Sequence, residues 1–336
     1  MKRVLYLDFI RILSCVMIIA MHAPIPNTGM GSYVLSADSF LTAPGIGLFI
    51  MVSGALLLPV NMETMQFLKR RLKKIFFPTL FWTIFYMLVS SCNNELDRTD
   101  MFRSLLSIPF SNQFCGTLWF MYMLTGLYLL APVLSPWLRQ VGKKELKFYL
   151  FLWSVTMCYP LIRDYIHINE SYTGILYYFG GYVGYFVWGY YLRTYVSEWK
   201  FWKCLLLLLI PIFIAIVTKV MQIDTNFYDM FWYLSIFVVM MSTAWFMLIK
   251  RINIWLEDTY RFHSYIIIIS NCCFGIYLIH IFVMRSIIWK WSWMYDIGYL
   301  QILVVTLFTF IGSLFITWLL SFLPWAQFII GFKRTK

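Results

Sequence analysis

Three side chains that a lipid bilayer disfavours lie within one apolar run near the start of the chain. The run from Asp8 to His22 reads DFIRILSCVMIIAMH and carries an acid, an arginine and a histidine. Ionisable groups inside a membrane segment are rare, and by default they indicate a functional site. Histidine can act as a general base because its unperturbed pKa lies near neutrality. The run is therefore a candidate site for acid–base chemistry.

The spacing of Arg11 and His22 places both on one face of a helix. Eleven positions separate them, and at about 100° per residue this completes three turns with about 20° left over. At a rise of about 1.5 Å per residue they lie about 16 Å apart along the axis, too far for direct contact. Asp8 precedes Arg11 by three positions and can pair with it. We expect Arg11 near the inner membrane face and His22 near the outer end.

A purely structural interpretation explains the same residues. Asp8 and Arg11 would form a neutralised pair at the interface, with the Arg11 side chain extended towards water. His22 would simply end a helix at the opposite interface. The shared face of Arg11 and His22 favours a common polar channel over these two separate explanations.

A second candidate site is the basic segment FLKRRLKKIFFP. One interpretation is the excess of positive charge typical of cytoplasmic loops, together with contact to anionic lipid. The other is a site for a phosphorylated cytoplasmic ligand, because guanidinium and ammonium groups at helical spacing bind phosphate. The basic residues of this segment extend from Lys69 to Lys74, the densest cluster of positive charge in the chain.

Weaker candidates lie in three other apolar segments. The segment GIGLFIMVSGALLL contains Ser53 and glycines that predict close helix packing. Trp119 belongs to TLWFMYMLTGLYLLAPVL, where an aromatic belt at the membrane surface is the simpler explanation. The segment ISNCCFGIYLIHIF contributes Asn271, Tyr277 and His280.

The composition identifies the kind of scaffold that must position these residues. The chain is 61% hydrophobic and 12% charged, about half the charged fraction of a soluble domain. Apolar runs of about 20 residues favour membrane helices over the shorter alternating strands of a barrel. The net charge of +12 lies in short clusters between these runs, which argues against nucleic-acid binding. The seven cysteines show no metal-ligand spacing, and a disulfide between Cys92 and Cys115 is left open.

The predicted fold is an all-α polytopic membrane bundle of ten helices. Twenty of the 27 Lys and Arg residues fall in segments on the side of the N-terminus and six on the other side, which predicts that both termini are cytoplasmic. No linker interrupts the pattern, so residues 1–336 are expected to form a single membrane domain with no appended soluble domain. The predicted spans are 7–24, 43–60, 75–92, 117–135, 147–163, 173–193, 203–221, 229–249, 265–284 and 300–322.

In combination, these segments resemble the acyltransferase 3 family of bacterial membrane acyltransferases. The most specific match is the family's R-x10-H pattern, which falls on Arg11 and His22. The family's R-x-x-R pattern falls on Arg71 and Lys74, and its FFxxSG element resembles residues 48–54. The segments LWFMYMLTGLYLLAPVL, YYFGGYVGYFVWGYYL and FGIYLIH are also similar, closest to the branch that O-acetylates surface polysaccharides of the enterobacterial common antigen type.

Two positions depart from the family pattern. Lys74 replaces the second arginine of R-x-x-R, which keeps the charge but loses bidentate phosphate geometry. Thr117 stands two residues before Trp119, where this branch often has histidine. The second departure puts the details of acceptor recognition in question.

The resemblance implies an O-acetyltransferase of the bacterial inner membrane. An acyl-CoA, most commonly acetyl-CoA, would donate from the cytoplasm to a hydroxyl of a glycan or lipid-linked saccharide, with membrane lipids around the protein and no permanently bound cofactor. The coenzyme A headgroup would bind Arg70, Arg71 and Lys74, and also Arg11. His22 would be the general base, and Asp8 would hold Arg11. Residues expected to line the pocket are Ser53, Trp119, Asn271, Tyr277 and His280.

An exporter or flippase of glycan polymers or lipid-linked sugars is the alternative from another functional class. Ten spans, aromatic grooves and intramembrane charges suit it as well. The discriminating feature is the phosphate site, because a flippase has no need of a cytoplasmic phosphate clamp aligned with a histidine across the membrane. A membrane-embedded scaffold, the third class, makes no use of the face shared by Arg11 and His22.

Overall fold

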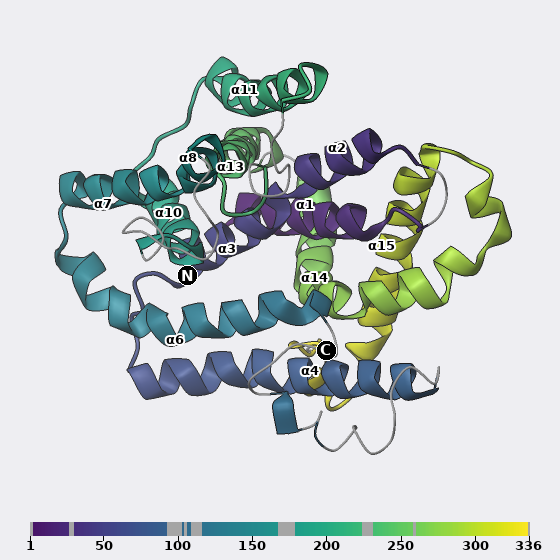
Figure 1. Cartoon of the computed structure of the whole chain (residues 1–336). Helices are drawn as coiled ribbons and strands as arrows, with labels where there is room; N and C mark the ends of the chain where they lie inside the picture. Colours follow the sequence, from purple (N-terminus) through teal and green to yellow (C-terminus); the bar gives the residue numbers. More distant parts are fainter. Residues whose placement is uncertain are drawn as a thin grey trace. The chain divides into compact units, whose positions relative to one another are not determined.

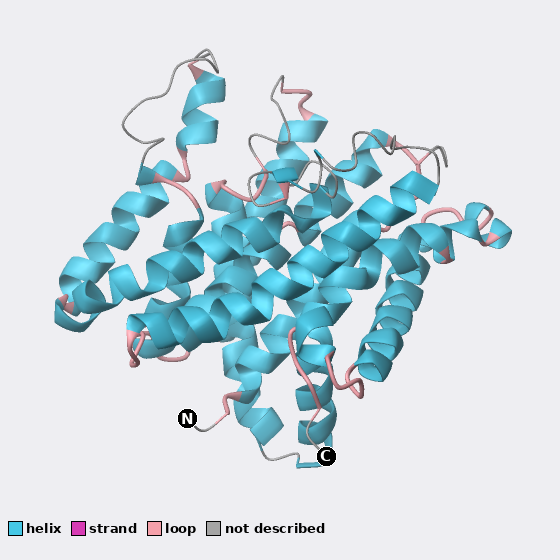
Figure 2. Ribbon diagram, turned by 90° about the horizontal axis from the view of Figure 1, so that it is seen from below, coloured by secondary structure: helices cyan, strands magenta, loops and turns pink. Residues whose placement is uncertain are grey.

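The computed structural model confirms the all-α prediction. It describes residues 3–26, 30–92, 103, 106–108, 116–166, 179–223, 231–257 and 260–334. All regular structure within these ranges is helical, and Figure 2 shows the helices joined by loops. The proposed partner cysteines, Cys92 and Cys115, have side chains outside the described part of the chain, so their pairing stays a prediction.

The helices follow the predicted apolar segments closely (Figure 1). They comprise α1 (Leu5–His22), α2 (Ser32–Thr42), α3 (Pro44–Leu57), α4 (Thr64–Cys92), α6 (Trp119–Gln140), α7 (Lys143–Thr156), α8 (Tyr159–Tyr165), α10 (Tyr182–Thr194), α11 (Phe201–Val220), α13 (Ile236–Glu257), α14 (Tyr260–Ser286), α15 (Leu300–Leu320) and α16 (Ala326–Ile329), with short 3₁₀ turns at Gly116–Leu118, Ile288–Lys290 and Ser292–Tyr295.

Seven helical segments in the described ranges are long and apolar enough to cross a membrane. Each of the ten predicted spans overlaps a helix, but not every helix reaches that length. The span 147–163 is divided between α7 and α8, and α10 has only 13 described residues. The chain is a multi-span membrane protein, while the count of ten and the cytoplasmic termini stay predictions.

The described residues form two compact units, each built from segments distant in sequence. Unit 1 combines residues 1–58 with 136–270, and unit 2 combines residues 59–135 with 271–336. Unit 1 contains α1, α2, α3, α7, α8, α10, α11 and α13, and unit 2 contains α4, α15 and α16. Helices α6 and α14 contribute residues to both units.

Helix α3 is the centre of unit 1, and glycines let its backbone contact a second helix. A Cβ atom added to Gly54 would lie 1.7 Å from the carbonyl oxygen of Phe186 on α10. A Cβ atom on Gly189 of α10 would lie 1.9 Å from the carbonyl oxygen of Met51. Small residues allow such close approach of membrane helices. The structure therefore confirms the predicted packing role of Gly54.

Two further glycines of α3 face other helices of unit 1. A Cβ atom on Gly45 would lie 2.9 Å from Met17 Cβ on α1, and one on Gly47 would lie 2.8 Å from Ser242 Oγ on α13. Helix α3 thus touches α1, α10 and α13 at positions where a side chain would not fit. These contacts fix α1, which carries Asp8, Arg11 and His22.

In unit 1, cationic side chains donate hydrogen bonds to backbone carbonyl oxygens at two helix ends. Arg193 donates a hydrogen bond to the carbonyl oxygen of Ala55, near the end of α3. Lys250 Nζ donates to the carbonyl oxygens of Leu192 (2.9 Å) and Val196 (2.7 Å), at the end of α10. Carbonyls at a helix C-terminus lack intrahelical partners and attract positive charge. Some of the positive charge counted as a topology signal therefore also has a structural role.

Substitution of Gly54 by alanine should disrupt unit 1. The new methyl group would overlap backbone atoms of α10, which cannot rotate away, so we expect a loss of about 3 kcal/mol or more. The measurement is the folded, monodisperse fraction in detergent after a heating series. Gly126→Ala is the matched control, because a Cβ atom at Gly126 in α6 meets nothing within 4 Å. Equal folded fractions for the two variants would contradict the assignment of α3 as the packing centre.

Candidate active site

Helix α1 carries the three ionisable residues of the first candidate site. It runs without interruption from Leu5 to His22, so Arg11 and His22 share the helix on which the predicted spacing depends. Asp8 lies in its first turn, where a negative charge stabilises the positive end of the helix dipole.

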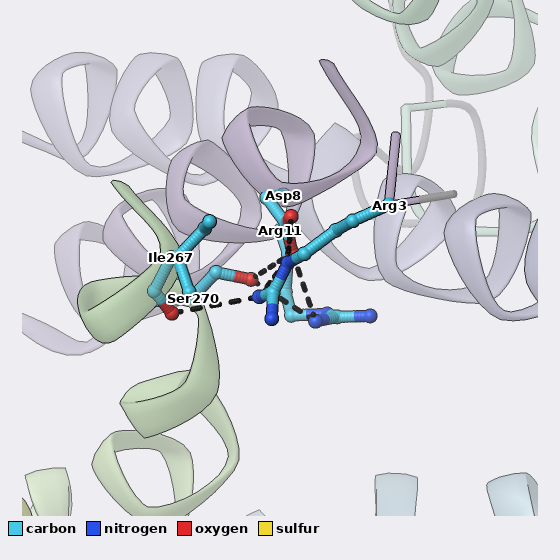
Figure 3. Close-up of polar contacts among 5 residues, drawn as sticks. All are labelled: Arg3, Asp8, Arg11, Ile267 and Ser270. Carbon is cyan, nitrogen blue, oxygen red and sulfur yellow. Dashed lines mark hydrogen bonds and ion pairs between the residues drawn. The ribbon is translucent and has the colours of Figure 1, made fainter. Parts of the chain in front are cut away.

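Asp8 is the centre of a hydrogen-bonded network (Figure 3). Its side chain is only 7% exposed, and Arg3 binds it with two hydrogen bonds. Arg3 Nε donates to Oδ2 at 2.7 Å, and Arg3 Nη2 donates to Oδ1 at 3.0 Å. Such bidentate, charge-assisted pairs are among the stronger hydrogen bonds in proteins. Arg3 is therefore the principal ionic partner of Asp8.

Ser270 of α14 connects Asp8 to Arg11. Its hydroxyl donates to Asp8 Oδ1 at 2.6 Å and accepts a hydrogen bond from Arg11 Nη1 at 3.0 Å. The direct distance from Arg11 Nη1 to Asp8 Oδ1 is 3.5 Å. The predicted pairing of Asp8 with Arg11 is present, but Ser270 supplies the closer contact. Two guanidinium groups around one carboxylate leave the cluster with one excess positive charge.

Sequence analysis missed Arg3 and Ser270. Arg3 belongs to the basic N-terminal segment that predicts topology, and it precedes Asp8 by five positions. Ser270 lies in the run IIIISN beside Asn271, which was selected instead. A polar residue in an apolar run is a weak signal, and the contact between Ser270 and Asp8 joins positions 262 residues apart. Only tertiary packing reveals it.

His22 lies at the end of α1 and is half-buried. The side chains between it and Arg11 on the same face are buried: Ser14 is fully buried and donates to the Ile10 carbonyl oxygen at 2.7 Å, and Cys15 and Ile18 are almost inaccessible. The face between the two predicted functional residues is therefore packed protein in this structure. A continuous conduit along it stays a prediction.

The basic segment lines a cavity in unit 2. A cavity of about 340 Å³ is lined by Met62, Arg70, Arg71, Lys73, Lys74 and Gln327. The structure thus brings together the three predicted phosphate ligands on α4 and adds Lys73. Among the described residues, no carboxylate lies within ion-pair distance of these four cations.

The C-terminal segment forms part of this cavity and was not predicted. Helix α16 packs against α4, where Trp82 Nε1 donates to the carbonyl oxygen of Ile329 at 2.9 Å. Lys73 Nζ lies 5.0 Å from the centre of the Phe328 ring, within the range of a cation–π contact. This packing places Gln327, the residue before Phe328, in the cavity wall.

The weaker candidates fall into different parts of the structure. In unit 2, the Phe120 ring lies 5.5 Å from the Tyr277 ring, which lies 5.6 Å from His280, and Trp119 adjoins Phe120. Tyr277 also donates to the Thr117 carbonyl oxygen. The remaining two candidates do not belong to this aromatic cluster: Ser53 lies on α3 in unit 1 with its hydroxyl bonded to the Phe49 carbonyl oxygen, and Asn271 is exposed on α14.

Neutralising Asp8 should destabilise unit 1. Asp8→Asn leaves two arginines without their counter-charge, and unpaired buried charges are costly. Because Arg3 is 42% exposed, water offsets part of the loss, and we expect a destabilisation of about 2 kcal/mol. Thermal unfolding in detergent measures it. Asp296→Asn, at an exposed carboxylate in unit 2, should leave the midpoint unchanged. Identical midpoints for both variants would show that the network does not stabilise the protein.

The described residues thus offer two kinds of candidate site, one for acid–base chemistry and one for binding an anion. A histidine ends α1, the same helix whose first turn carries the Arg3–Asp8–Arg11 network. A separate four-cation cavity on α4 is suited to an anionic ligand. No curated protein and no solved structure is significantly similar to this chain.

The family comparison covers both helices that carry the candidate residues, α1 and α4. A family model described as an acyltransferase domain matches residues 4–322, which covers nearly the whole chain. The matched region includes α1 with Arg11 and His22, and it includes Arg71 and Lys74 of the basic cavity. The chain belongs to the acyltransferase 3 family and is a membrane acyltransferase.

Proposed function

We propose that this protein transfers an acyl group, most simply acetyl, from cytoplasmic acyl-CoA to a hydroxyl of a surface glycan or lipid-linked saccharide. The observation that carries the proposal is the four-cation cavity on α4 in a chain of the acyltransferase 3 family. The proposed setting is the bacterial inner membrane, and the proposed branch is the one that modifies surface polysaccharides of the enterobacterial common antigen type.

The basic cavity is the proposed site for the donor headgroup. Coenzyme A carries several phosphate groups, and Arg71 is half-buried while its neighbours Arg70 and Lys74 are exposed. Arg71 can therefore form the better-ordered phosphate contact, and the exposed cations add attraction from solution. Lys74 contributes charge without the planar fork of arginine. The proposed contribution of Arg11 is its excess positive charge, which it shares with Arg3 around Asp8.

His22 is the proposed general base. A ring nitrogen accepts the proton of the acceptor hydroxyl as that oxygen attacks the thioester carbonyl carbon. The carbon–sulfur bond then breaks, coenzyme A leaves as thiolate and takes up a proton, and an ester remains on the acceptor. General-base catalysis of this kind contributes typically about 10²–10⁴-fold. Transfer through an acyl-histidine is the covalent variant of the same role.

The Arg3–Asp8–Arg11 network is proposed to position α1 rather than to react. Its hydrogen bonds fix the start of the helix to Ser270 and to the carbonyl oxygen of Ile267 on α14. His22 is the last residue of the same helix. Because a helix resists bending, a shift of its first turn would also move His22. Asp8 and Arg11 thus act on the reaction through the placement of His22 and of the donor.

Purified protein in liposomes containing a saccharide acceptor and radiolabelled acetyl-CoA tests the reaction class. Label on the acceptor or covalently on the protein supports acyl transfer. An exporter would instead move the saccharide across the bilayer without taking up label. Mass spectrometry of surface glycans from strains with and without the gene then identifies the acceptor.

Removal of the His22 imidazole should abolish acylation while the protein still inserts and accumulates. We expect His22→Ala to lower the transfer rate by about 10²–10⁴-fold because the proton acceptor is lost. The measurement is acetate released by alkali from the surface glycan, normalised to protein in the membrane. His263→Ala, at another half-buried histidine, is the control. Full acetate release from the His22→Ala strain would exclude the general-base role.

Loss of Arg71 should weaken donor binding selectively. Arg71→Ala removes a charge-assisted contact, so we expect the KM for acetyl-CoA to rise about tenfold with the acceptor KM unchanged. Lys74→Arg restores the bidentate group of the family pattern and should lower the KM for acetyl-CoA. Lys144→Ala, at an exposed lysine of α7, is the charge-matched control. Unchanged binding of labelled acetyl-CoA to Arg71→Ala would place the headgroup site elsewhere.

A further inference from the structure

Helices α2 and α11 both belong to unit 1. Side chains of both helices line a partly open apolar groove of about 500 Å³. The lining comes from one face of each helix: Tyr33, Ser36, Ala37, Phe40 and Leu41 from α2, and Ile212, Ala215, Ile216, Lys219 and Val220 from α11, followed by Gln222. None of these residues belongs to the candidate active site described above.

The groove is polar at one end and apolar at the other. Lys219 Nζ lies 5.7 Å from the centre of the Tyr33 ring, which places the end of α11 beside the start of α2. From that point the lining continues towards Phe40 and Leu41 on α2 and towards Ile212 on α11. The described lining therefore combines the charge of Lys219 with an otherwise largely apolar surface.

The polar end also holds the one non-glycine residue of the described chain with positive φ. Gln222 has φ of 49° and follows the last turn of α11. The Gln222 amide donates to the Lys219 carbonyl oxygen at 3.2 Å, and the Ile223 amide donates to the Thr218 carbonyl oxygen at 3.1 Å. This is the Schellman arrangement, in which glycine is the usual residue at the left-handed position. A glutamine there is strained, and strained residues often mark functional positions.

We propose that the groove binds one acyl chain of an anionic phospholipid, with its phosphate paired to Lys219. Along either helix the lining extends over nine residues, or eight residue-to-residue steps, from Tyr33 to Leu41 or from Ile212 to Val220. At about 1.5 Å per residue this is about 12 Å, which fits within the hydrocarbon depth of one leaflet, about 15 Å. A phosphate at the headgroup level would then lie beside Lys219, at the end of the groove that the Gln222 side chain also lines.

The exposed apolar surface of α11 favours a bilayer lipid as the ligand of the groove. The surface of α11 outside the groove exposes large apolar side chains, among them Leu209, Phe213 and Val217. In a membrane these side chains contact lipid chains, so a neighbouring phospholipid can enter the groove sideways. The bound chain would fill the space between α2 and α11 and join the two helices within unit 1.

Native mass spectrometry of the full protein tests the site. Protein from nanodiscs of phosphatidylglycerol and phosphatidylcholine in equal amounts should retain phosphatidylglycerol preferentially. Lys219→Gln should lower this retention about tenfold because the charge-assisted contact is lost. Ala37→Trp should lower it by filling the groove. The matched controls are Lys203→Gln and Val217→Trp, two positions on α11 outside the lining, and both should retain lipid as the wild type does.

The variant Gln222→Gly distinguishes an effect on lipid binding from an effect on the stability of the fold. Glycine relieves the strain of positive φ, so the lipid-free variant should melt at the same or a higher temperature than the wild type. Its retention of phosphatidylglycerol should nevertheless fall, because the side-chain amide is gone. Added phosphatidylglycerol should raise the melting temperature of the wild type more than that of Lys219→Gln.

Three results would overturn the proposal. The first is equal retention of phosphatidylglycerol and phosphatidylcholine by the wild type. The second is unchanged retention in both Lys219→Gln and Ala37→Trp relative to their controls. The third is preference for a polyisoprenyl phosphate over phosphatidylglycerol in direct competition, which would assign the groove to a different class of lipid.

Discussion

The direct contact between the backbones of α3 and α10 is the constraint on which the rest of unit 1 depends. Gly54 and Gly189 leave no room for a Cβ atom at this contact, so the two helices cannot separate or slide without losing it. Gly45 and Gly47 of α3 lie against α1 and α13, where an added Cβ atom would also be too close to the neighbouring helix. Because membrane helices associate without a hydrophobic driving force from water, such close packing is the main source of their stability. The position of α1, and with it of His22, follows from this packing.

The polar residues of α1 are tolerated in an apolar run because protein groups replace water around them. Asp8 accepts hydrogen bonds from Arg3 and Ser270, and Arg11 donates to Ser270. The opposite situation holds on α4, where four cations share a cavity without a carboxylate among the described residues. A cluster whose arginines bind a buried carboxylate orders the start of a helix, whereas a cluster of cations without a described carboxylate is suited to an anionic ligand. This contrast separates the positioning role proposed for Asp8 from the binding role proposed for Arg71.

The sequence by itself determined the membrane class, the all-helical fold and the residues of the two motifs. Hydropathy and helical spacing are local properties, so they sufficed to place Arg11 and His22 on one helix and to predict the packing role of Gly54. The order of motifs also identified the family, which the family model confirms over residues 4–322. The structure adds one helix that was not predicted, α2, and divides the predicted span 147–163 between α7 and α8. Both differences concern the boundaries of helices and leave the all-helical class of the fold unchanged.

Tertiary structure alone decided which distant residues complete each site. Ser270 carries no distinctive local pattern, and its role arises only because α1 and α14 meet at Asp8. Gln327 enters the basic cavity only because α16 folds back onto α4. The groove at Lys219 likewise joins two helices separated by more than 150 residues. Periodicity specifies which face of a helix is apolar or polar, but not which other helix covers it, because that choice depends on complementary packing between segments far apart in the chain.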